Sequence, residues 1–93
     1  MAIISGGIYK IKHPQRFGDF LSQSIWIKQV NVQYPCFFEI QFWHDDGVAM
    51  LMGLKETDLV EIDVELRGKL WENRHTRVES VINIFKAVSI KKV

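Results

Sequence analysis

Large aromatic side chains alternate with polar ones in the stretch CFFEIQFW, residues 36–43. If this stretch is a β-strand, its side chains point alternately to two faces. One face is apolar and predicts a core: Cys36, Phe38, Ile40 and Phe42. The other face combines two aromatic and two polar side chains: Phe37, Glu39, Gln41 and Trp43. Outward aromatic rings beside polar groups are suited to stacking against flat ligands such as nucleic-acid bases.

Further aromatic side chains stand beside basic ones elsewhere in the chain. Trp26 is two residues from Lys28, and Trp71 lies in the basic segment 67–77. Proteins hold single-stranded nucleic acids by stacking bases on aromatic rings, at about 1–3 kcal/mol per base, while lysine and arginine follow the phosphates. We therefore predict a nucleic-acid-binding surface of ten residues: Trp26, Lys28, Phe37, Gln41, Trp43, Arg67, Lys69, Trp71, Arg74 and Arg77.

Several aromatic residues also have structural alternatives. Trp43 could pack under a following helix, Phe37 could lie in an interface between subunits, and Trp71 could fold back over the end of the fold. Glu39 opposes the nucleic-acid interpretation, because a carboxylate in such a surface repels phosphate. The sequence assigns no role to Tyr9 or Tyr34.

Residues that could catalyse a reaction or bind a metal are scattered. His13, His44 and His75 fall in three separate loops, without the HExxH or CxxC spacing of metal sites. The single cysteine, Cys36, has core parity, and a buried cysteine is usually structural. We expect a protein that is not an enzyme and that has no cofactor and no metal.

Length and composition indicate one small domain. The 93 residues are 47% hydrophobic and 25% charged, with a formal net charge of +1, and residues 1–93 suffice for one core. One cysteine permits no intrachain disulfide, which suits a reducing compartment. The chain contains no run of about 18 apolar residues, which a membrane span would require, and the N-terminus lacks the pattern of a signal peptide. We expect a cytoplasmic protein without membrane contact.

Charge is distributed unevenly along the chain. Residues 34–65 contain eight acidic side chains and one lysine, whereas residues 66–93 contain seven basic and two acidic side chains. Such asymmetry can create a basic surface on a nearly neutral protein. It equally fits a soluble domain with mixed surface charge.

The apolar pattern predicts five strands and one short helix. The strands are expected at residues 2–12, 24–33, 36–43, 58–69 and 78–92, with the helix at 48–54 and loops at 13–23 and 69–77. Gly6 and Gly7 predict a bulge or bend in the first strand. This order is that of a five-stranded OB-fold barrel, which binds oligonucleotides through strands two and three and the loops after strands one and four. An SH3-like barrel would not need the helix.

Parity assigns side chains within these elements. The fourth strand should bury Val60, Ile62, Val64 and Leu66. The helix should bury Val48, Leu51, Met52 and Leu54. A one-residue bulge near residues 28–29 would bring Val30 and Val32 to the same side as Ile25 and Ile27.

Short motifs extend over residues 26–87. They are Trp26, Lys28-Gln29, Gln33-Tyr34-Pro35, Phe38-Glu39-Ile40, Phe42-Trp43, Leu66-Arg67-Gly68-Lys69, Trp71 and Asn83-Ile84-Phe85-Lys86-Ala87. In these motifs the chain resembles a family of small bacterial and phage proteins related in fold to single-stranded DNA-binding (SSB) proteins. The resemblance implies single-stranded DNA binding with little sequence preference, in replication or recombination, by a homo-oligomer. The chain ends in Ile90-Lys91-Lys92-Val93, so we expect no recruitment of partners through an acidic tail like that of bacterial SSB proteins.

Two alternatives stay open. RNA could replace DNA, because a contact to the 2′-hydroxyl group cannot be read from the sequence. The outward aromatics could instead form the interface of a protein-interaction or structural oligomerisation module, which the low net charge favours.

Overall fold

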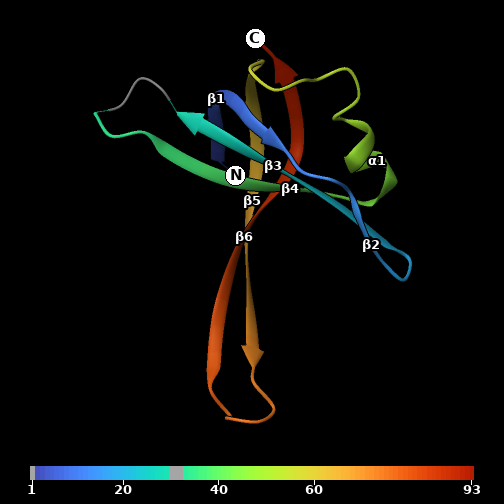
Figure 1. The fold of residues 1–93 in the computed structure, drawn as a ribbon, viewed down its shortest axis with the longest axis vertical. Helices are drawn as coiled ribbons and strands as arrows, with labels where there is room; N and C mark the ends of the chain where they lie inside the picture. Colours follow the sequence, from blue (N-terminus) through green and yellow to red (C-terminus); the bar gives the residue numbers. More distant parts are fainter. Residues whose placement is uncertain (1, 30–32) are drawn as a thin grey trace.

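The protein is described by a computed structural model that covers residues 2–29 and 33–93. It consists of β-strands and one short helix (Figure 1). The elements are β1 (Ala2–Ile11), β2 (Gln15–Phe17), β3 (Phe20–Gln29), β4 (Cys36–Trp43), α1 (His44–Ala49), β5 (Leu59–Glu72) and β6 (Glu79–Lys92). The five long strands, with a helix between the third and the fourth, follow the predicted order of an OB-fold.

The first strand closes the sheet into a barrel. The strand order is β1-β5-β6-β4-β3-β2, and β1 also pairs with β3. Residues 2–7 of β1 pair with β5, whereas residues 7–11 pair with β3, with a register shift between Ile8 and Lys10. A Cβ atom on Gly6 would lie only 2.5 Å from the Lys28 carbonyl oxygen, so glycine permits this close approach of strands. The irregularity predicted in β1 is present, but the register shift lies at Tyr9, two residues after Gly7.

Alternating side chains from the long strands fill the barrel. The most deeply buried are Ile25, Ile27, Ile40, Phe42, Val60, Ile62 and Val64. The inward parity predicted for residues 38–42 and 60–64 is therefore confirmed. Because these faces are covered, their alternate residues must point outward from the barrel.

Three side chains predicted to be buried are exposed. Cys36 lies at the beginning of β4, outside the core. Leu66 is exposed because β5 leaves the barrel at that point. Met52 is 81% exposed because α1 ends at Ala49 and Met52 lies in the following turns, although Leu51 is buried as predicted.

The helix begins and ends earlier than predicted. It spans His44–Ala49 rather than residues 48–54. Two acidic residues, Asp45 and Asp46, occupy its first turn, where carboxylates favour the positive end of the helix dipole. Gly47 is buried, and a Cβ atom there would lie 3.4 Å from the Phe42 backbone, so this turn packs closely on β4.

Two predicted loops are partly strands. Residues 13–23 contain β2 and the beginning of β3, which form a hairpin around Gly18, whose φ is +61°. Residues 69–72 extend β5, so the turn between β5 and β6 comprises only residues 73–78. Strand β3 ends at Gln29, and the predicted bulge that involves Val30 and Val32 lies outside the described residues.

The β5–β6 hairpin extends well beyond the barrel as a two-stranded arm, residues 66–84 (Figure 1). Cross-strand pairs continue from Leu66 and Phe85 to Glu72 and Glu79 at the turn.

Within residues 2–29 and 33–93, the structure contains no helix that is long and apolar enough to cross a membrane.

Candidate nucleic-acid interface

The outward faces of β3, β4 and β6 form one surface beside the core. Trp26 pairs in register with Glu39, and Lys28 pairs with Phe37. Gln41 pairs with Lys86 of β6. These pairs lie on the side of the sheet opposite to the buried residues of the same strands. Side chains alternate along each strand, so the residues between those that fill the barrel form this surface.

Trp26 is held at its edge and flanked by cations. Its Nε1–H donates a hydrogen bond of 2.7 Å to Oε2 of Glu39. The ammonium groups of Lys10 and Lys12 lie 5.0 and 5.6 Å from the indole centroid. Cations at such distances are attracted to the negative face of an aromatic ring.

Phe37 is 53% exposed and borders a cavity. Its ring meets the Tyr9 ring edge to face, with centroids 5.1 Å apart, and the Lys28 ammonium lies 5.8 Å from its centroid. The cavity has a volume of about 350 Å³ and is lined by Tyr9, Trp26, Phe37, Phe38 and Glu39.

Trp43 is half-buried at the end of β4, directly before α1. Its Nε1–H donates a hydrogen bond of 2.8 Å to the Gln41 side-chain oxygen. The Arg67 guanidinium and the Lys86 ammonium each lie 5.3 Å from its ring. The Phe20 ring meets the indole edge to face. Trp43 therefore contacts both neighbouring aromatic and basic side chains.

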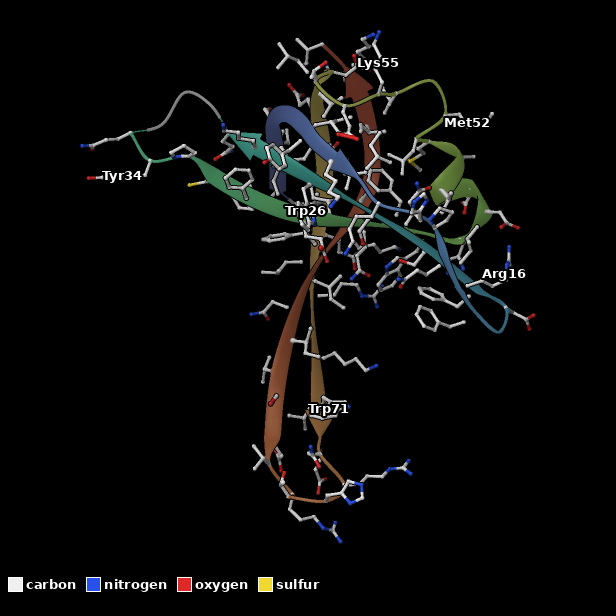
Figure 2. All side chains as sticks on the ribbon, in the orientation of Figure 1. Arg16, Trp26, Tyr34, Met52, Lys55 and Trp71 are labelled. Carbon is white, nitrogen blue, oxygen red and sulfur yellow. The ribbon has the colours of Figure 1, made fainter. Side chains whose placement is uncertain are left out.

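The arm carries the remaining predicted residues away from the barrel. Arg67, Lys69 and Trp71 share one face of β5, opposite Ile84, Ile82 and Ser80 of β6. Because Arg67 reaches Trp43, this face continues the outward surface of the barrel. Figure 2 shows Trp71 on the arm, well separated from Trp26. Its pairing with Ser80 contradicts the alternative that Trp71 folds back over the barrel.

Arg74 and Arg77 lie at the turn of the arm, where both are exposed. The Arg77 guanidinium is 3.4 Å from a carboxylate oxygen of Glu72. Five of the ten predicted residues thus lie on the barrel face, and five lie on the arm: Arg67, which reaches back to Trp43, and Lys69, Trp71, Arg74 and Arg77.

Four residues of this surface were not predicted from the sequence. Tyr9, Lys10 and Lys12 come from β1 and the segment after it, and Lys86 comes from β6. Lys86 could have been found from parity, since its neighbours Phe85 and Ala87 face the core. The residues of β1 were hidden by the register shift at Tyr9, which breaks simple alternation.

Metal-binding groups do not gather in the described part of the chain. In residues 2–29 and 33–93, no three side chains of His, Cys, Asp or Glu come close enough together to hold a metal ion.

Comparison with known proteins identifies the fold. No protein-family profile matches the chain, and no curated protein matches its sequence significantly. Among solved structures, the chain is similar to the mitochondrial single-stranded DNA-binding protein Rim1 from S. cerevisiae, with a TM-score of 0.77 and 12% sequence identity. The match covers 99% of this chain and 92% of that chain. This likeness shows that the chain has the OB-fold of SSB proteins, as its motifs predicted.

Proposed function

We propose that this protein binds single-stranded DNA with little sequence preference. The observation that carries the proposal is that three outward rings on one surface, those of Trp26, Phe37 and Trp43, each lie within about 6 Å of one or two cations. Bases would stack on these rings and the cations would contact the phosphates. The similarity in fold to a protein named for single-stranded DNA binding supports the same function.

The strand would cross the barrel face and continue onto the arm. It would pass from Phe37 and Trp26 to Trp43, and then along the face of β5 that carries Lys69 and Trp71. The lysine and arginine side chains have flexible stems, so they can cover the rings in the free protein and turn towards phosphates in the complex. Because every base has a π face, such stacking tolerates any sequence.

The biological role would be to protect or organise single strands during replication or recombination. Residues 1–93 would act as one binding domain. Binding needs neither catalysis nor a cofactor, because the aromatic and basic side chains supply both stacking and charge.

A homo-oligomer is the second part of the proposal. The face of the arm that continues the barrel interior carries three exposed apolar side chains, Leu66, Leu70 and Val81. A two-stranded ribbon alone is marginally stable in water, so this face favours burial against a second copy of the chain. The alternative function, a protein-interaction or structural oligomerisation module, would rest on this face and on the outward aromatics.

The first test is intrinsic tryptophan fluorescence during titration with oligodeoxythymidine at low and at raised salt. All three tryptophans of the chain lie on the proposed surface, so we expect saturable quenching. The affinity should fall as salt rises, because phosphate contacts release counterions. A flat titration of folded protein at low salt would rule out the DNA proposal, and equal binding of oligouridine would extend it to RNA.

A further inference from the structure

We infer that the cavity between Tyr9, Trp26, Phe37 and Glu39 holds a guanine base of the bound strand, selected by the Glu39 carboxylate. This inference rests on the proposed function and adds to it a site that prefers one base. The cavity volume of about 350 Å³ lies within the range of about 300–1,000 Å³ that is typical of small-molecule sites.

The walls of the cavity suit a planar ring. Tyr9 and Phe37 meet edge to face, and the Trp26 indole adds a further aromatic wall. These rings contribute apolar surface against which a base can stack. They do not distinguish one base from another, since stacking has little dependence on base identity.

Glu39 supplies the group that can distinguish bases. Its Oε2 accepts the hydrogen bond from Trp26 and lies 3.7 Å from the Lys12 ammonium. Its Oε1 has no hydrogen-bond partner within the part of the chain that the structure describes. The side chain is 47% exposed, so one oxygen is fixed while the other is available to a ligand. An ionised carboxylate only accepts hydrogen bonds, so it requires a donor.

Guanine matches this requirement better than the other DNA bases. Its Watson–Crick edge presents the N1–H and the N2 amino group as adjacent donors. Oε1 of Glu39 can accept one of them, and Oε2 can accept the other with the lone pair that Trp26 does not use. On the Watson–Crick edge of adenine and of cytosine, one amino group lies next to a ring nitrogen that accepts hydrogen bonds. On the same edge of thymine, the N3–H lies between two carbonyl groups. Acceptors that face a carboxylate are repelled by it. This preference also explains an acidic side chain on a surface that would contact phosphates.

The test compares three oligonucleotides of equal length and equal phosphate number. One is oligodeoxythymidine, the second has interspersed guanines, and the third has hypoxanthine (inosine) at the same positions, which removes only the 2-amino group. We expect the wild-type protein to bind the guanine oligomer about five- to tenfold more tightly than the thymidine oligomer, with inosine between them. In Glu39→Gln this preference should disappear, because the amide replaces one acceptor oxygen by a donor.

The matched control is Glu65→Gln, which removes the same charge from the outward face of β5 without changing the cavity. It should keep the guanine preference. Equal affinity of the wild-type protein for all three oligomers would overturn the guanine site and leave the proposed function intact. A preference that survives Glu39→Gln would also overturn it. Failure to bind any oligomer at low salt would instead refute the proposed function.

Discussion

Trp43 combines the two interactions on which the proposed DNA surface depends. Its indole is oriented by the hydrogen bond to Gln41 and lies beside the cations of Arg67 and Lys86. Orientation before binding reduces the entropy that is lost when a base stacks. Trp26 is oriented in the same way by Glu39. Trp26 and Trp43 therefore each present a ring at a defined angle, next to a charge that can contact a phosphate.

Replacement of Trp43 by alanine should weaken binding of oligodeoxythymidine. Loss of one base stack costs about 1–3 kcal/mol, so the dissociation constant should rise about five- to 150-fold. Fluorescence anisotropy of a labelled oligonucleotide measures this change. Tyr34→Ala is the matched control, since Tyr34 is an exposed aromatic residue before β4, outside the proposed surface (Figure 2). Equal losses in both variants would contradict the assigned role of Trp43.

Replacement of Lys86 by glutamine should change the salt dependence of binding. One phosphate contact would be lost, so the slope of log K against log salt should become shallower by about 0.7 for a single strand. Lys55→Gln removes an equal charge from the loop between α1 and β5 and should leave the slope unchanged (Figure 2). An unchanged slope in the Lys86 variant would show that Lys86 does not contact phosphate.

At the scale of elements, β1 determines whether the barrel closes. It pairs with β5 through its first half and with β3 through its second half, and Gly6 lies at a close approach to the Lys28 backbone of β3. The same strand carries Tyr9 and Lys10 to the aromatic surface. The closure of the barrel and the composition of the candidate site thus depend on one strand.

Gly6→Ala should destabilise the protein, because its Cβ atom would lie 2.5 Å from the Lys28 carbonyl oxygen and 2.8 Å from Cγ2 of Ile27. Such overpacking typically costs about 1–3 kcal/mol of unfolding free energy. Gly7→Ala is the control, since its Cβ atom would meet only Cδ2 of Leu59 at 3.7 Å. Urea denaturation compares the two variants, and equal unfolding free energies would contradict the close approach at Gly6.

At the scale of the whole molecule, the two faces of the arm differ in composition. One face carries Arg67, Lys69 and Trp71 and continues the aromatic surface. The opposite face carries Leu70 and Val81, which are 64% and 69% exposed. This division allows one face to contact DNA while the other packs against a second copy of the chain.

Leu70→Asp should reduce the molecular mass in solution to that of one chain, because a carboxylate on the apolar face would be buried in the proposed interface. Light scattering coupled to size-exclusion chromatography measures the mass. Trp71→Ala, on the opposite face, should keep the wild-type mass and weaken DNA binding. A monomeric wild-type protein, or an unchanged mass in Leu70→Asp, would contradict the proposed oligomer.

The alternation of β4 and the order of elements could be predicted from the chain alone. Phe38, Ile40 and Phe42 point inward and Phe37 and Trp43 outward because side-chain direction in a strand is a local property with a period of two. The same local pattern predicted the OB-fold, which the structural comparison confirmed.

The tertiary structure decided which of these faces are covered and which distant side chains meet. Leu66 continues the inward alternation of β5 but is exposed, because none of the other elements in the described residues packs over the arm at that point. Lys10 reaches Trp26 and Lys86 reaches Trp43 through strand pairings between distant parts of the sequence. A local period gives the direction of a side chain, whereas its neighbours depend on long-range pairing and register, which only the closed barrel establishes.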